Sequence, residues 1–398
     1  MGQGQRADVR MQFNDGTTFS EWLSFDLRDT WTDPLGDFRF EAAPGRDRIP
    51  LYVEKLQKGE LVTIVINGAN QGTFLIQTVT TRIGKATGVT FSVACHTPLI
   101  TPYQGSVDPK VSFKSQTDAP VGSVLLKALG AYGFDTEIDG DNTANVSAIT
   151  GKPLKGGAAA FPVDALKDNQ CCAQDGETAY QFCARILTRL GIAMHVNVDG
   201  AILVRSPDYS QDPIGTLVVS ADPTVSGDRF IDDVEIVDTN DNQFSECVVI
   251  GNPNDQSGQT QTAKPEARVT TNYLFPSRPA YKSRGTADAP APAGYKPLII
   301  KDKNARDRAR CLSVAKLALG IRAKDAFVIS GAVAGFTSST TGALWTAGTV
   351  VNVQLDPIRF AEPMFVLECH KHRSRDAADV TRFRLIPLGA LVLGDAPG

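Results

Sequence analysis

Short runs of β-branched and aromatic residues dominate the first hundred positions of the chain. They occur at Leu61–Ile66, where Thr63 alternates with apolar neighbours, and again at 74–79 and 89–93. Asn67-Gly68 follows the first run, and both residues tolerate the positive φ that a tight hairpin turn requires. Several short strands joined by such turns are typical of a barrel or sandwich. We therefore expect residues 8–106 to form a first β domain.

Helical spacing replaces this pattern over residues 107–215. Apolar residues share one helical face in 120–129, with Gly133 as a stop, and in 177–190, with Gly191 as a stop. Residues 192–198 and 201–205 flank Asp199-Gly200 and predict a hairpin. The intervening segment 139–157 is rich in Gly, Asn, Thr and Ala, which predicts a loop. The region 107–215 is therefore expected to be a small α+β domain.

Strand patterns resume at residue 216 and close the chain. They occur at 215–220, 233–237 and 246–250, and later at 326–330, 350–355, 364–369 and 381–386. Between these groups, 251–294 is polar and rich in Pro and Gly without a clear period, so 251–300 is interpreted as a long insertion or loop. Apolar positions in 304–319 predict a helix, placed within 301–320. Residues 216–250 and 321–398 would then form a second β domain.

Composition and charge argue against a membrane protein and against a protein that binds duplex DNA tightly. Hydrophobic residues make up 42% and charged residues 21% of the 398 positions, which is typical of a soluble globular protein. The formal net charge is -4, whereas proteins that hold duplex DNA by its phosphates usually carry a basic surplus. The N-terminus is polar and no apolar run approaches the roughly 20 residues that span a bilayer. We expect folding in a cytoplasm and no stable membrane binding.

The sequence holds one metal-like cluster, Cys369-His370-Lys371-His372. On a strand, His370 and His372 share a face and could bind zinc. No further ligand is evident nearby, so a solvent-facing strand end is favoured over a metal site, with Cys369, His370 and His372 as the weaker alternative. Neither a phosphate-binding loop nor a recognisable catalytic motif is present. We expect no cofactor, no catalytic residues and no enzymatic activity.

The chain has seven cysteines, and two of them are adjacent. An odd count does not favour an internal disulfide framework, and Cys171 and Cys172 could bridge each other only with strained geometry. Two free thiols are the simpler interpretation. The alternative is that Cys171 and Cys172 are inter-subunit thiols, which crosslink to a neighbouring chain in an oxidising environment.

Several short motifs follow one another in an order that resembles a known family. They are Gly36-Asp-Phe-Arg-Phe40, the run from Gly59 to Gly68, Glu177-Thr-Ala followed by Gly191, Phe244-Ser-Glu-Cys-Val-Val-Ile-Gly251, and Gly342-Ala-Leu-Trp345. The succession is similar to the central baseplate hub of contractile-tailed phages, as in Mu-like phages. It resembles more distantly the T-even hub and the hub region of type VI secretion spikes.

The resemblance implies a fold and a set of partners. The fold would be mainly β with an α+β insertion: two tube-like antiparallel β-barrels and a small α+β domain, which form a ring. As a homotrimer, the chain would connect a hexameric tail tube to a trimeric spike in the virion baseplate and form a channel for DNA. Partners would be the spike, the tube or tube-terminal protein, baseplate wedge proteins and the tape-measure protein, with DNA present only in transit.

A channel that DNA crosses should not bind phosphate, so its wall should hold more acidic and neutral polar side chains than Lys and Arg. Thr63, Glu235, Asn352 and Gln354 are candidates for such a wall, and the basic run 301–310 should lie outside it. Two alternatives stay open at this level: a tail-associated cell-wall hydrolase and a glycan-binding receptor-recognition protein.

Overall fold

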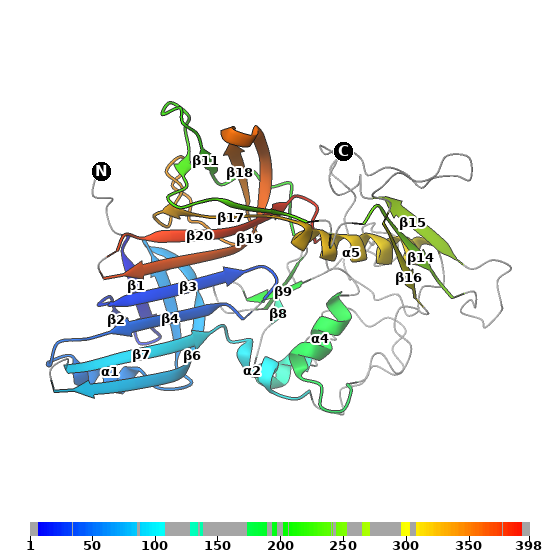
Figure 1. The fold of residues 1–398 in the computed structure, drawn as a ribbon. Coiled ribbons are helices and arrows are strands. Elements are labelled where there is room, and N and C mark those ends of the chain that lie inside the picture. The colour runs from blue at the N-terminus through cyan, green and yellow to red at the C-terminus, as the bar shows by residue number, and fades with distance from the viewer. Residues whose placement is uncertain are drawn as a thin grey trace, which may run out of the picture.

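The computed structural model describes residues 7–33, 35–85, 88–107, 128–133, 136–137, 173–188, 193–196, 202–205, 207–239, 241, 244–252, 265–270, 296–302, 308–375 and 377–391. Strands predominate among them, and a few helices lie at the margins of the sheets (Figure 1). The predicted mainly β fold class with an α+β part is therefore confirmed.

The first β region holds seven strands. They are β1 Val9–Phe13, β2 Thr18–Phe19, β3 Ser24–Thr30, β4 Asp37–Ala42, β5 Leu61–Ile66, β6 Ala69–Gly84 and β7 Gly88–His96. The turn between β5 and β6 has φ of 51° at Asn67 and 81° at Gly68, as the sequence predicts. A short helix that sequence inspection missed, α1 Ile49–Lys55, stacks Tyr52 on Phe19 with ring centroids 4.0 Å apart. This helix covers one end of the apolar core.

The second β region also holds seven strands. They are β11 Thr216–Val219, β12 Asp228–Arg229, β13 Glu235–Asp238, β17 Phe327–Ala334, β18 Val350–Leu355, β19 Phe360–Ser374 and β20 Val380–Pro387, with a short 3-10 turn at Asp356–Ile358. The strand patterns predicted at 215–220, 233–237, 326–330, 350–355, 364–369 and 381–386 each overlap one of these strands. The pattern at 246–250, expected in the same domain, forms a strand of a separate three-stranded sheet instead. Val353 and Leu385 on these strands pack in one buried cluster with Trp345, which precedes β18.

The two β regions are one hydrogen-bonded sheet. Antiparallel pairing of β3 with β19 joins them into 14 strands, in the order β12-β11-β18-β19-β3-β4-β7-β6-β5-β1-β2, with β20, β17 and β13 branching from β19. Figure 1 shows β19 and β20 beside β3. The expectation of two antiparallel barrels differs from this arrangement. The pairings among the described strands run open from β2 to β12, and β11 pairs in parallel with both β12 and β18. Within each region the described strand pairings form an open series, from β3 to β2 in the first and from β12 to β13 in the second.

In Figure 1 the α+β part lies beside the first β region and below α5. It comprises α2 Ile100–Gln104, a 3-10 turn at Gly130–Tyr132, β8 Thr136–Glu137, α4 Ala179–Thr188, β9 Ala193–Val196 and β10 Ile202–Arg205. The predicted second helix and hairpin are confirmed as α4 and the β9–β10 pair. Gly133 ends the preceding turn with φ of 78°. Most of the predicted helix 120–129 and all of the predicted loop 139–157 lie outside the described residues.

A three-stranded sheet and a long helix complete the fold. The strands are β14 Glu246–Ile250, β15 Glu266–Thr270 and β16 Pro297–Lys301, and α5 spans Arg308–Ala326. The interpretation of 251–300 as loop is wrong at β15 and β16, which pair on either side of β14. The helix continues seven residues beyond the predicted end at Leu319, because Ala323 and Ala326 still pack inward. None of the described helices is long and apolar enough to cross a membrane.

Candidate functional site

The 14-stranded sheet has a polar face that crosses both β regions. Residues directly opposite each other on paired strands lie on the same face, and the register places Asp26 opposite His372 and Arg39, and Arg28 opposite His370 and Asp37. The opposite face of these strands carries the buried aromatic side chains of the core, including Phe25 and Phe38. The β3–β19 pairing therefore makes one continuous polar surface out of two segments separated by more than 300 positions.

Ion pairs connect neighbouring strands across this polar face. Arg28 Nη2 lies 3.1 Å from Glu368 Oε2, and Arg384 Nη1 lies 3.3 Å from Glu368 Oε1. Arg384 Nη2 also contacts Asp325 Oδ1 at 3.1 Å, which ties the end of α5 to β20. Exposed pairs of this kind contribute about 0–1 kcal/mol each. Their effect is mainly to neutralise the arginines.

The two histidines of the sequence cluster meet one carboxylate on the polar face. Asp26 Oδ1 lies 2.9 Å from His370 Nε2 and 2.7 Å from His372 Nδ1. Cys369 points to the opposite face, where its thiol donates to the Trp345 carbonyl oxygen at 3.4 Å and burial raises its pKa to about 11. The structure thus brings His370 and His372 together and separates Cys369 from them. The described residues contain no group of three or more side chains suited to a metal ion.

Acidic and hydroxyl side chains outnumber arginines on the polar face. The face carries five carboxylates and several hydroxyls, against four arginines, along β13, β17, β20, β19, β3, β4 and β7. The carboxylates are Glu235, Glu368, Asp26, Asp37 and Glu41; the hydroxyls include Ser330, Thr30, Ser24, Ser374 and Ser92; the arginines are Arg384, Arg382, Arg28 and Arg39. Such a surface has no strong basic field that would retain a polyanion.

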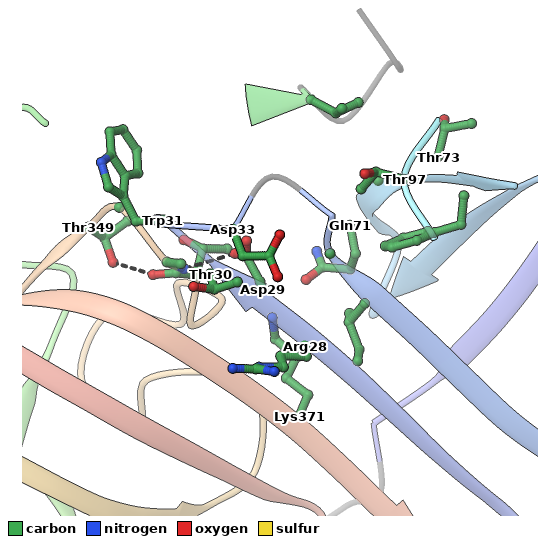
Figure 2. Close-up of a pocket in the computed structure, with 18 of the residues that line it drawn as sticks. Arg28, Asp29, Thr30, Trp31, Asp33, Gln71, Thr73, Thr97, Thr349 and Lys371 are labelled. Carbon is green, nitrogen blue, oxygen red and sulfur yellow. Dashed lines mark hydrogen bonds between the residues drawn. The ribbon is translucent and has the colours of Figure 1, made fainter. Parts of the chain in front are cut away.

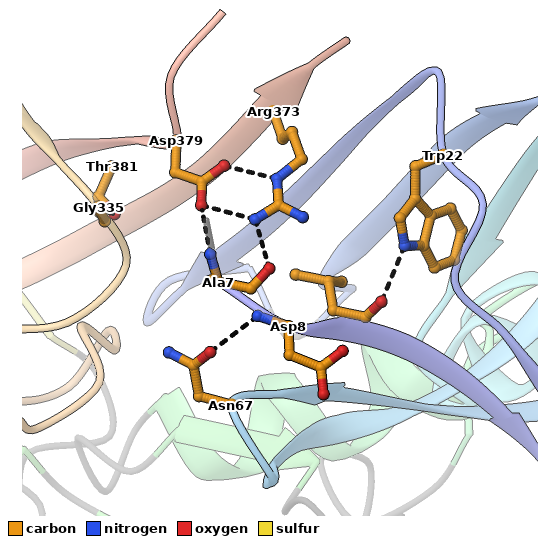
Figure 3. Close-up of polar contacts among 9 residues, drawn as sticks. Ala7, Asp8, Trp22, Asn67, Gly335, Arg373, Asp379 and Thr381 are labelled. Carbon is orange, nitrogen blue, oxygen red and sulfur yellow. Dashed lines mark hydrogen bonds and ion pairs between the residues drawn. The ribbon is translucent and has the colours of Figure 1, made fainter. Parts of the chain in front are cut away.

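A buried ion pair ties the N-terminal strand to the β19–β20 hairpin (Figure 3). Arg373 Nε and Nη2 donate to the two carboxylate oxygens of Asp379 at 2.5 and 2.6 Å. Arg373 Nη2 also donates to the Ala7 carbonyl oxygen at 2.6 Å, and the Ala7 N–H donates to Asp379 Oδ2 at 3.0 Å. The guanidinium lies over the rings of Phe25 and Phe336. This clamp fixes the first β region against the second at a point where both partners are buried.

A cleft of about 430 Å³ opens at the other end of the β3–β19 pair (Figure 2). Its walls come from distant segments: residues 27–31 and 33 at the end of β3 and just after it, 70–74 at the start of β6, and 346–349 before β18. The Ala347 N–H donates to Asp29 Oδ2 at 2.9 Å, and the Leu35 N–H donates to Asp33 Oδ1 at 3.0 Å. Lys371, from β19, also lines this cleft and is 1% exposed. No sequence pattern could have indicated this cleft, because its walls meet only in the folded sheet.

The remaining sequence candidates are placed as follows. Cys171 and Cys172 lie outside the described residues, so their role as inter-subunit thiols stays a prediction. The five cysteines that the structure describes are buried and free: Cys95, Cys183, Cys247, Cys311 and Cys369. Of the basic run, Lys301 ends β16 and Arg308 begins α5, both exposed, and 303–307 lie outside the described residues.

Solved structures of tail proteins share this whole architecture. The tail protein from Neisseria meningitidis aligns with 98% of this chain and 99% of its own, at a TM-score of 0.69 and 18% identity. The chain has the fold of a phage tail protein. The 43 kDa tail protein of prophage MuSo2 from Shewanella oneidensis covers 96% of this chain and 99% of its own, at a TM-score of 0.68 and 16% identity.

A third tail protein, from a Listeria monocytogenes prophage, covers 95% of this chain and 94% of its own, at a TM-score of 0.55 and 11% identity. No family model matches the sequence, and no curated protein matches it. The tail-protein fold therefore extends over nearly the whole chain, although fewer than one residue in five is identical. The family resemblance inferred from short ordered motifs is confirmed at the level of the fold.

Proposed function

We propose that this chain is a structural, non-enzymatic subunit of a phage-type tail, and specifically the central hub of a contractile baseplate. The observation that carries the proposal is the end-to-end match of this fold to tail proteins. In this role three copies form a ring between the hexameric tail tube and the trimeric spike. The ring contacts wedge and tape-measure proteins and assembles in the host cytoplasm.

The polar sheet face supports a conduit role. DNA in transit must not be retained, and retention grows with each phosphate that a Lys or Arg neutralises. On this face the arginines are fewer than the acidic and hydroxyl side chains, and Arg28 and Arg384 are already paired with carboxylates. Thr63 and Glu235, expected from the sequence to line such a wall, both project from the less buried side of their strands. We assign this face to the bore of the ring.

Two measurements test the assembly role. Light scattering of the purified chain should give a mass of about three times 42.6 kDa, alone or after addition of its spike protein. A reconstruction of the tail particle should then place the chain between tube and spike. Only monomer in both conditions, or a position elsewhere in the particle, would contradict the hub. Lysis on a peptidoglycan zymogram would favour the hydrolase instead.

Charge reversal tests the bore assignment separately. Glu235→Lys combined with Thr63→Lys adds positive charge to the polar face, and we expect particles to assemble normally but to deliver DNA more slowly. The control is Glu60→Lys, which adds positive charge at an exposed site just before β5. Equal delivery by both variants would argue against this face as the channel wall, while leaving the tail role intact.

A further inference from the structure

We propose that the cleft beside the β3–β19 junction binds a carboxylate through the ammonium of Lys371, and that this carboxylate is an acidic side chain of a neighbouring protein. The site would exist whether or not the chain serves as a hub, because it is built entirely from residues of one chain.

Lys371 is a buried cation that no carboxylate contacts directly within the described part of the chain. It is 1% exposed, and no hydrogen bond or ion pair to its ammonium is formed within the described part of the chain. The neighbouring cations differ: Arg373 is held by Asp379, and Arg28 by Glu368. The ammonium has three N–H donors and faces the cleft, where only the little water that reaches it can accept them. Among these three cations, Lys371 is therefore the one whose N–H donors lack a bound acceptor.

The lysine side chain is directed into the cleft. It shares the inward face of β19 with Cys369 and Arg373, and in Figure 2 it reaches from its strand toward Asp29 and Thr30. Asp29 and Asp33 also line the cleft, yet each accepts a backbone N–H and neither forms an ion pair with Lys371. The site is thus open to an additional acceptor.

The charges around the cleft select the class of anion. With two carboxylates already in the wall, a phosphate of nearly two negative charges would be repelled, whereas a singly charged carboxylate adds the least repulsion. The remaining wall carries hydroxyl and amide groups, including Thr349, whose Oγ1 donates to the Thr346 carbonyl oxygen at 2.7 Å, and Gln211. A volume of about 430 Å³ is within the usual range for binding pockets and far exceeds a bare carboxylate. We therefore assign the occupant to a peptide segment rather than to a free small acid.

The test uses the full chain and a capped aspartate, N-acetyl-aspartate N-methylamide, as the probe. Its uncharged counterpart is the capped asparagine. Denaturant unfolding is measured for wild type, for Lys371→Met, and for Lys58→Met, which removes the same charge from an exposed site. At a probe concentration about nine times its dissociation constant, the folding equilibrium constant should rise about tenfold in wild type and Lys58→Met. It should not change in Lys371→Met, and capped asparagine should have no effect.

Several results would overturn the proposal. An equal response in Lys371→Met would place the probe elsewhere, and an equal response to phosphate or to chloride at matched ionic strength would refute the selection by charge. Acetate as effective as the capped aspartate would refute a peptide occupant. Without ligand, Lys371→Met should be at least as stable as wild type, because an unpaired buried charge is removed. Marked destabilisation of both Lys371→Met and Lys371→Gln would show an internal role for the ammonium and sink the idea.

Discussion

Replacing Asp379 by asparagine should strongly destabilise the fold. The substitution preserves the shape of the side chain but removes the charge that faces the Arg373 guanidinium, whose side chain is only 11% exposed. Asp379 accepts two N–H donors from Arg373 and one from the Ala7 backbone. An asparagine presents one oxygen and one NH₂ group to these three donors. At least one N–H of Arg373 or Ala7 would then face the NH₂ group, which is also a donor.

The expected loss of unfolding free energy follows from the burial of this ion pair. Removing one partner of a buried ion pair costs about 3–5 kcal/mol, because the remaining charge has no counter-ion and no water. Each hydrogen bond to a charged group contributes about 1.5–3 kcal/mol, which agrees with the loss of one or two of the three contacts. We therefore expect Asp379→Asn to lower the free energy of unfolding by about 3–5 kcal/mol.

The assay is urea or guanidinium unfolding followed by tryptophan fluorescence at neutral pH. Asp8→Asn is the matched control, because Asp8 lies next to Ala7 but pairs with Arg10 on the surface, with side chains 50% and 57% exposed. The control should change the free energy by less than about 0.5 kcal/mol. A double substitution, Arg373→Met with Asp379→Asn, should recover part of the loss. Asp379→Asn with a loss no larger than the control would refute the clamp as a major contribution to stability.

Three further outcomes follow from the structure. Burial tends to raise the pKa of Glu177, but two hydrogen bonds from Arg185 and one from the Gln174 N–H outweigh burial and hold the pKa below its usual 4.5. The stability that this ion pair adds is complete above pH 4.5 and is lost as pH falls through the lower folded pKa. The difference in free energy of unfolding between wild type and Glu177→Gln should therefore disappear in acid, and a difference independent of pH would contradict this. Burial raises the pKa of Cys95 to about 12, so native protein at pH 8 should not be alkylated there by iodoacetamide, as peptide mass mapping would show, whereas unfolded protein should be. Gly68→Val should cost about 1–2 kcal/mol in the same unfolding assay, because φ at Gly68 is 81°; an unchanged midpoint would show that the turn adapts.

Local sequence patterns were sufficient wherever one element determines its own structure. Asn67-Gly68 specifies a tight turn, and the apolar face of 177–190 specifies α4, because both depend on contacts within a few residues. The pattern failed at β15, where the alternating residues Glu266–Thr270 are embedded in a long polar segment and become a strand only by pairing with β14. It also ended α5 too early, because the buried alanines near its C-terminal end give a weak hydrophobic signal.

The sequence by itself determined the β-rich class, the α+β part and, through the order of short motifs, the likeness to phage tail proteins. Only the tertiary structure decided that β3 and β19 pair, since no local pattern specifies which edges meet across more than 300 residues. That pairing assembles the polar face from two regions and brings Asp26 to His370 and His372. It also places Lys371 at the cleft: in the sequence Lys371 is one more charge in a polar run, whereas in the folded sheet it is a buried cation that lines the cleft.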